Sequence, residues 1–212
     1  MAKGIQTKKE IRIKAIALFK KSGYDNVSIV EIAKASGISK NTFYYYFASK
    51  EDLIRSMFIP DELMDAETAV QMMSIQDPYK RLMDIFSKAA SYFSDCGRDI
   101  VKKFLVMNLT GQIMQNEKEP IARSENRAYV QMIQCTFRQA QEADEVRRDI
   151  SPEELSRITA AMLIGCVQIW ATFEKSQNLQ DLVRRNIEIL VKEPNAEKKS
   201  ISSKVAGNRK LL

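Results

Sequence analysis

The chain has 212 residues, of which 45% are hydrophobic and 28% charged. This length and hydrophobic content are enough to form the core of one or two domains, and they argue against a chain that is disordered throughout. It contains no histidine, which excludes histidine-based triads, HExxH zinc sites and the Glu-x-x-His di-iron motif. The three cysteines, Cys96, Cys135 and Cys166, are odd in number and far apart, which argues against a disulfide framework or a zinc site.

The net charge of +6 is unevenly placed along the chain. Residues 1–50 hold ten Lys/Arg and three Asp/Glu, residues 51–193 hold eighteen and twenty-three, and residues 194–212 hold five and one. A basic head on an acidic body predicts a polyanionic partner for the head. The Lys-, Ser- and Asn-rich segment 194–212 is expected to be a basic, disordered tail.

The start of the chain lacks the continuous apolar segment of a signal peptide. The longest apolar stretch, residues 158–173, is interrupted by Thr159, Gln168 and Thr172 and falls short of the ~20 residues of a membrane span. We therefore expect a cytoplasmic protein in which this stretch is a buried core helix.

Low glycine and proline content and several helix-capping patterns predict an all-α fold. Thr7-Lys8-Lys9-Glu10 reads as a capping box that starts the first helix, which ends before Gly23. Its expected inward side holds Ile11, Ala15, Leu18 and Phe19.

Two short helices should follow within the basic head. Ser28 and Glu31 form a second capping box, which predicts a helix over about residues 29–35. Ser36-Gly37-Ile38 then predicts a tight turn, because Gly37 can adopt positive φ at little cost. Ser39 is the expected N-cap of a helix of about two turns, and Ser49 caps the next one.

The run Phe43-Tyr44-Tyr45-Tyr46-Phe47 favours a strand by composition alone. Capped helices lie on both sides and no partner strand is apparent, so we predict a helix. At ~100° per residue Phe43 and Phe47 share an inward face, and Tyr45 lies opposite them. Two short helices around a glycine turn, the second polar at its start, predict a helix-turn-helix.

In a helix-turn-helix the start of the second helix reads base edges in the major groove. Thr42 can contact a thymine methyl and Asn41 can bond adenine, while tyrosine hydroxyls, lysines and helix N-termini suit phosphates. The predicted DNA-binding residues are Ser28, Ser39, Lys40, Asn41, Thr42, Tyr44, Tyr45, Tyr46 and Lys50. The alternative for the tyrosines is that they are ordinary half-buried aromatics of a helical protein.

Residues 27–53, VSIVEIAKASGISKNTFYYYFASKEDL, resemble the DNA-binding signature of the TetR/AcrR family of bacterial transcription regulators. The matching positions are Ala33, Gly37, Ser39, Lys40, Thr42, Tyr44, Phe47 and residues 49–53. Tyr46 stands where the family often has histidine, and Asn41 is bulkier than the small residue frequent there. The resemblance implies a three-helix helix-turn-helix domain over residues 1–50 and a larger helical ligand-binding and dimerisation domain over residues 51–193.

The body is expected to form helices near residues 50–74 (kinked or interrupted by Pro60), 78–94, 98–115, 120–143, 152–176 and 178–192. The helix over 152–176 has a large apolar stripe, with Leu155, Met162, Cys166, Ile169, Trp170 and Phe173, and a second stripe of mostly small residues, with Ala161, Gly165, Gln168 and Thr172. A two-sided helix needs cover on both sides. With the helix over 178–192 it could supply half of a four-helix homodimer interface, the arrangement that the family uses.

The resemblance further implies a small-molecule effector that changes the spacing of the two heads. The Met and aromatic content of the body favours a hydrophobic compound. Met and aromatic side chains suit such a pocket; the candidates are Phe86, Tyr92, Phe104, Met107, Met132, Phe137 and Trp170, with core packing as the alternative for each. No metal or cofactor motif is evident. The expected function is a ligand-responsive repressor, against two rivals: a DNA-binding accessory protein without an inducer, and a helical enzyme with a nucleic-acid-binding head.

Overall fold

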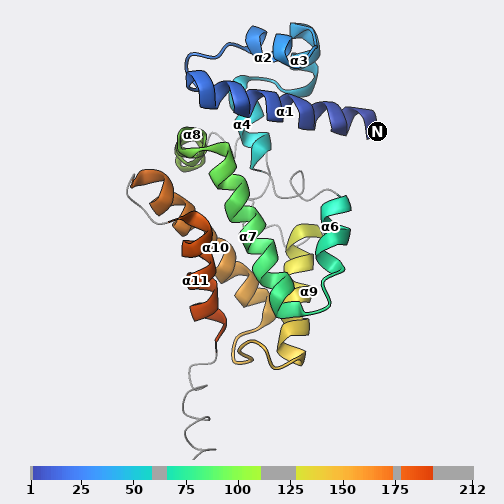
Figure 1. The fold of residues 1–212 in the computed structure, drawn as a ribbon, viewed down its shortest axis with the longest axis vertical. Helices are drawn as coiled ribbons and strands as arrows, with labels where there is room; N and C mark the ends of the chain where they lie inside the picture. The colour runs from blue at the N-terminus through green and yellow to red at the C-terminus, as the bar shows by residue number, and fades with distance from the viewer. Residues whose placement is uncertain (1, 59–65, 111–127, 174–177, 193–212) are drawn as a thin grey trace, which may run out of the picture.

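The computed structural model describes residues 2–58, 66–110, 128–173 and 178–192, and within these ranges the regular structure is helical, with no strand. Figure 1 shows a small head at one end of an elongated molecule and a larger helical body below it. The all-α prediction is therefore confirmed.

The head consists of α1 (Ala2–Ser22), α2 (Ile29–Ala35), α3 (Lys40–Tyr46) and α4 (Lys50–Met57). The predicted start of the first helix at Thr7 is wrong, because α1 already begins at Ala2 and Thr7 lies inside it. A Thr-x-x-Glu spacing also occurs in helix interiors, and the preceding lysine, glutamine and alanine are good helix formers. Of the predicted inward residues, Ile11, Ala15 and Phe19 are buried, and Leu18 is half-buried against the same core.

The three later caps of the head form as predicted, because each depends on residues three positions apart. The Ser28 hydroxyl accepts a bond from the Glu31 N–H at 3.2 Å, and the Glu31 carboxylate accepts one from the Ser28 N–H at 2.8 Å. Ser39 and Ser49 accept the corresponding N–H bonds at the starts of α3 and α4, both at 3.0 Å. Gly37 has the expected positive φ, 67°.

The body consists of α6 (Ala66–Met73), α7 (Pro78–Cys96), α8 (Arg98–Leu109), α9 (Ala128–Glu142), α10 (Pro152–Thr172) and α11 (Leu179–Val191). Asp77 and Ser151 cap α7 and α10 as predicted, each with proline at the start of the helix. The interruption predicted within residues 50–74 is present, because α4 ends at Met57 and α6 begins at Ala66. α8 and α10 end earlier than predicted, at Leu109 and Thr172. Pro60, the predicted start near residue 120 and the tail over 194–212 lie outside the described residues.

α10 lies at the centre of the body, in contact with α7, α8, α9 and α11. By length and composition it is the one helix in the described ranges that could cross a membrane, and 44% of its most apolar window is buried inside the protein. Leu155, Val167 and Ala171 of α10 are fully buried against the neighbouring helices. These contacts make it a core helix, as the sequence predicts.

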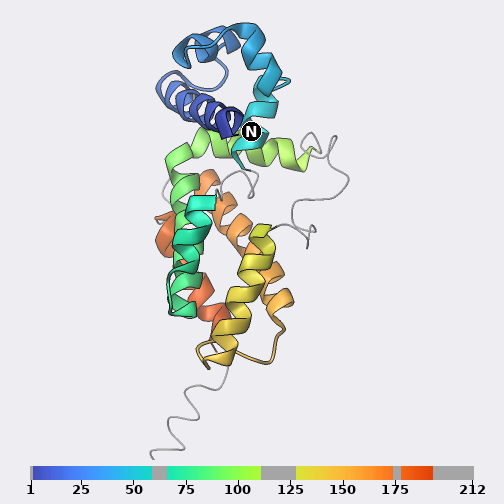
Figure 2. The ribbon, with the colours of Figure 1, turned by 90° about the vertical axis from the view of Figure 1, so that its right-hand side faces the viewer.

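α8 joins the two parts of the molecule. Figure 2 shows it running across the top of the body directly beneath the head. It contacts α1 and α4 on the head side and α7 and α10 on the body side.

Candidate nucleic-acid interface

The recognition-helix candidate α3 is fixed by its two phenylalanines. Phe43 and Phe47 are almost completely buried, with their ring centroids 5.6 Å apart. Ile32 and Ala33 of α2 belong to the same buried cluster, and Ile38 of the turn packs against it. The helical assignment of the aromatic run is thus confirmed, and α3 has one face turned into the head.

The opposite face of α3 is open to solvent. The side chain of Tyr45 is 82% exposed and that of Tyr44 is 45% exposed. Lys40 and Asn41 are also exposed, while Thr42 is half-buried. A polar and aromatic surface therefore starts at the N-terminus of α3, as helical geometry predicts from the sequence.

Thr42 is oriented by its neighbour at the cap. The hydroxyl oxygens of Ser39 and Thr42 lie 2.8 Å apart and share one hydrogen bond, and the Ser39 hydroxyl also accepts a bond from the Thr42 N–H. The Ser39 hydroxyl thus serves the helix cap and the side chain of Thr42 at once. Both residues retain lone pairs or a methyl group for a partner above the surface.

Two of the predicted phosphate-binding groups already have partners inside the head. The Lys50 ammonium donates to the backbone carbonyls of Tyr24 (2.8 Å) and Val27 (3.0 Å) and lies 4.1 Å from the centroid of the Tyr24 ring. The Ser28 N–H and hydroxyl both donate to Glu31, and these bonds lower the pKa of the Glu31 carboxyl. Tyr46, the last candidate, is half-buried at the end of α3.

Tyr24, between α1 and α2, is a structurally central residue that the sequence reasoning missed. Its ring is buried and its hydroxyl donates to the Glu51 carboxylate at 2.8 Å. Burial, and then the bond to Glu51, raise the pKa of the Tyr24 hydroxyl. The partners come from residues 26 and 27 positions further along the chain, a separation that helical periodicity cannot reveal. The available signal was its position between Gly23, which ends α1, and Ser28, which caps α2, where an aromatic residue is expected to pack between the two helices.

The proposed effector residues are mostly buried. Phe86, Phe104, Met107, Phe137 and Trp170 are each less than a tenth exposed, and Tyr92 and Met132 are half-buried. The rings of Tyr92 and Phe104 both lie against Phe58, a residue that was not predicted, with the Tyr92 centroid 6.2 Å from that of Phe58. The Phe58 ring lies 4.2 Å from that of Phe104 and stacks on Phe93 at 5.2 Å.

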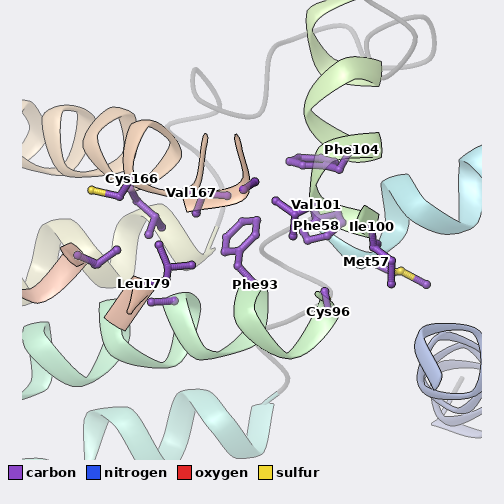
Figure 3. Packing of buried hydrophobic residues seen from close by; sticks show 14 of the residues in the cluster. Met57, Phe58, Phe93, Cys96, Ile100, Val101, Phe104, Cys166, Val167 and Leu179 are labelled. Atoms are coloured by element: carbon purple, nitrogen blue, oxygen red, sulfur yellow. The ribbon is translucent and has the colours of Figure 1, made fainter. Parts of the chain in front are cut away.

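Phe58 caps the end of α4, so this aromatic cluster connects the head to the body. Phe93 comes from α7 and Phe104 from α8. Figure 3 shows Phe58 among Phe93, Val101 and Phe104, next to Met57 at the end of α4. A rearrangement of these aromatic rings would therefore displace Phe58 and the last turn of α4.

α10 keeps a second face uncovered in the single chain. Ala161, Gln168 and Thr172 of the predicted small-residue stripe are exposed, and Gly165 is half-buried. Ile169 and Phe173, expected on the large buried stripe with Cys166 and Trp170, are instead 50% and 62% exposed. At 100° per residue Ile169 lies between the small-residue stripe and the buried side that holds Cys166 and Trp170. Phe173 is the C-cap of α10, where the backbone has left the helix.

Comparison with known proteins assigns the head to a family of DNA-binding domains. Residues 11–57 match the family model described as bacterial regulatory proteins, tetR family. A segment of 43 residues is 54% identical to the uncharacterized HTH-type transcriptional regulator YuxN of Bacillus subtilis, covering 20% of this chain and 15% of that protein.

Two longer similarities extend over the body. The HTH-type transcriptional regulator UidR of Escherichia coli is 23% identical over 160 residues, 75% of this chain and 79% of UidR. The crystal structure of Thermus thermophilus FadR, a TetR-family transcriptional repressor in complex with lauroyl-CoA, superposes with a TM-score of 0.58 at 23% identity, covering 89% of this chain and 98% of that one. The chain therefore carries a TetR-family DNA-binding domain over residues 11–57, and it has the fold of solved TetR-family regulators.

Proposed function

We propose that the protein is a homodimeric repressor that binds its operator through α3 of each subunit and releases it when a small hydrophobic molecule binds the body. The observation that carries this proposal is the division of α3 into two faces. Tyr45 is almost fully exposed while Phe43, two residues earlier, is completely buried. An exposed tyrosine on a short helix that is anchored by its opposite face presents its hydroxyl at a fixed place, which suits contacts with DNA phosphates.

The division suggests distinct roles along α3. Asn41 and Thr42, in the first turn, are the candidates for base-edge contacts in the major groove. Tyr44, Tyr45 and Tyr46 are candidates for phosphate contacts through their hydroxyls, and exposed Lys40 adds a positive charge. Ser28, Ser39 and Lys50 complete the proposed DNA-binding set.

The uncovered face of α10 supports the dimer. It places Ala161, Gly165 and Thr172 beside the exposed apolar side chains of Ile169 and Phe173. Small residues let two helix backbones approach closely, and the flanking apolar groups gain from leaving water. Ile189 of α11, 66% exposed, can extend the same interface.

The effector is proposed to act on the aromatic rings that surround the end of α4. Tyr92 and Phe104 touch Phe58, so a ligand that displaces either ring would shift α4 and the head with it. Phe86, Met107, Met132, Phe137 and Trp170 remain the other candidates for contacts with the effector. The complex of T. thermophilus FadR with lauroyl-CoA makes acyl chains a reasonable first probe.

The DNA-binding part is tested by selecting fragments from genomic DNA with the wild-type protein and titrating the recovered operator against a scrambled duplex. Wild type should prefer the operator strongly. Thr42→Ala should lose affinity for the operator but little for the scrambled duplex, since one good base contact is worth ~1–3 kcal/mol. Equal losses on both duplexes would remove Thr42 as a base reader, and failure to select any fragment would contradict operator binding.

The effector part is tested by thermal shift with lauroyl-CoA, laurate and free coenzyme A. A ligand of the folded protein at 100 times its Kd stabilises by about 2.7 kcal/mol. An apolar probe that raises the melting temperature should also release operator DNA. Operator binding with no response to any apolar compound in a broader screen would favour the accessory protein without an inducer.

A further inference from the structure

The head and the body meet in an electrostatic contact centred on Tyr24. Lys103 of α8 places its ammonium 4.9 Å from the centroid of the Tyr24 ring, and Lys50 of the head places its own 4.1 Å from the same centroid. Cations are attracted to the face of an aromatic ring, most strongly where water is partly excluded. Because the Tyr24 side chain is buried, Lys103 contacts a fixed part of the head.

Glu51 adds a negative charge to the same contact. Its carboxylate accepts the Tyr24 hydroxyl at 2.8 Å. Burial pushes the pKa of Glu51 upward, but the bonds it accepts and the charge of Lys103 lower that pKa overall. Lys103 thus faces both an aromatic ring and a carboxylate that belong to two different parts of the head, the turn after α1 and the start of α4.

A second contact ties α1 to the corner where α7 meets α8. The Lys20 ammonium donates to the backbone carbonyl of Asp95 at 3.1 Å. The aliphatic part of the same side chain lies against Gly97, where an added Cβ would meet Lys20 Cγ at 3.7 Å. The first half of α8 is therefore attached to the head at both of its ends.

The N-terminus of α8 is also attached to the last turn of α10. The Arg98 guanidinium donates to the backbone carbonyls of Trp170 and Phe173, the latter at 2.8 Å. It also lies 4.7 Å from the centroid of the Trp170 ring. The final carbonyls of a helix have no partner within it, so Arg98 completes the end of α10, next to the exposed side chain of Phe173.

We propose that α8 couples the position of α10, the proposed dimer helix, to the orientation of the DNA-binding head. Arg98 binds the C-terminus of α10, and Lys103 contacts Tyr24 and Glu51 of the head. A displacement of α10 then moves α8 through Arg98, and α8 reorients the head through Lys103. Lys103 and Arg98 are positioning residues, because neither lies on α3. The proposal rests on the proposed function, since it concerns how the two heads of a dimer are set for one operator.

Lys103→Met removes the charge and keeps the aliphatic stem. Lys102→Met is the matched control, because Lys102 is exposed. Both lower the net charge equally. Lys103→Met should weaken full-operator binding about two- to five-fold relative to Lys102→Met, the range expected for losing one cation–π contact. Lys103→Arg should restore the affinity.

A duplex with a single half-site separates orientation of the heads from loss of charge. One head suffices to bind it, so Lys103→Met and Lys102→Met should bind the half-site equally. Equal affinities of these two variants for the full operator, or a Lys103→Met defect of the same size on the half-site, would overturn the role of Lys103.

A double-mutant cycle tests whether the two attachments act through one helix. Arg98→Lys keeps the positive charge, but the lysine ammonium lacks the planar guanidinium that donates to two carbonyls at once. If α8 transmits the orientation, detaching either end should free the head, and the combination with Lys103→Met should lose little more than the stronger single variant. Fully additive losses of operator affinity would contradict the proposed coupling through α8. If wild type itself selects no operator, the proposed function fails instead, which is a distinguishable result.

Discussion

Adjacent aromatic side chains of α3 have opposite environments. Phe47 is 2% exposed and packs on Phe43, whereas Tyr45 is exposed and touches Tyr46 edge to face at 5.0 Å. The burial of Phe43 and Phe47 follows from their spacing of four residues, so the sequence alone was sufficient to predict it. The partners of Lys50 were not predictable in this way, because they are carbonyls of a loop more than twenty residues earlier.

Tyr45→Phe removes only a hydroxyl from an exposed ring. We expect the melting temperature to stay at the wild-type value and operator affinity to fall. Phe47→Ala, in contrast, should lower the free energy of unfolding by ~3–5 kcal/mol, because it opens a cavity in a small domain. Denaturant titrations and operator titrations on both variants distinguish the two effects. Early melting of Tyr45→Phe, or wild-type operator binding by it, would contradict the assignment of Tyr45 to the DNA-binding face.

Lys50→Ala and Lys40→Ala should differ although each removes one positive charge. Lys50 holds two backbone carbonyls together, and a hydrogen bond to a charged group contributes ~1.5–3 kcal/mol. Its loss should lower the melting temperature and weaken binding to all DNA. Because Lys40 is exposed, Lys40→Ala should leave the stability unchanged. It should reduce the slope of log affinity against log salt by about one. A stable Lys50→Ala variant would show that its contacts with Tyr24 and Val27 are dispensable.

At the scale of whole helices, local capping signals predicted the starts of α2, α3, α4, α7 and α10, because a cap is decided by residues that lie three positions apart. The start of α1 was wrong for the complementary reason. The same spacing at Thr7 has no structural meaning when the preceding residues can continue the helix. The coupling role of α8 could not be predicted either, since Lys103 and Arg98 are ordinary surface-type residues until the tertiary fold brings Tyr24 and Trp170 to them.

Gly165→Leu tests the uncovered face of α10. A Cβ at this position meets nothing within 4 Å in the single chain, so the substitution should not harm the subunit itself. In a dimer with closely packed α10 helices it should cost ~1–3 kcal/mol. Sedimentation should therefore show a concentration-dependent shift toward monomer, and operator affinity should fall at a site far from the DNA.

Ile169→Glu is a second test of the same face that does not depend on steric overlap. It would place a carboxylate among apolar side chains and should also favour the monomer. If both variants sediment as wild type does, α10 is not the dimer helix.

For the whole molecule, the absence of histidine has a measurable effect on the pH dependence of binding. No side chain has an ordinary pKa between about 5.5 and 7, the range in which histidine would titrate, so operator affinity at fixed ionic strength should change little there. Tyr46→His, at the position where the family often has histidine, should bind more tightly as the pH falls through about 6.5, because the imidazole then gains a charge near phosphates. A flat profile for Tyr46→His would place residue 46 away from the DNA.

The early start of α1 also has a practical consequence for handling the protein. At Gly4, in its first turn, an added Cβ would lie 3.9 Å from the Tyr46 ring, so this end of the chain emerges beside the proposed DNA-binding surface. α11 ends at Val191 at the opposite end of the molecule (Figure 1). An affinity tag fused before Ala2 would therefore compete with the operator, and a polyhistidine tag there would introduce the missing titratable groups. Purification and immobilisation through the C-terminal side leave α3 accessible.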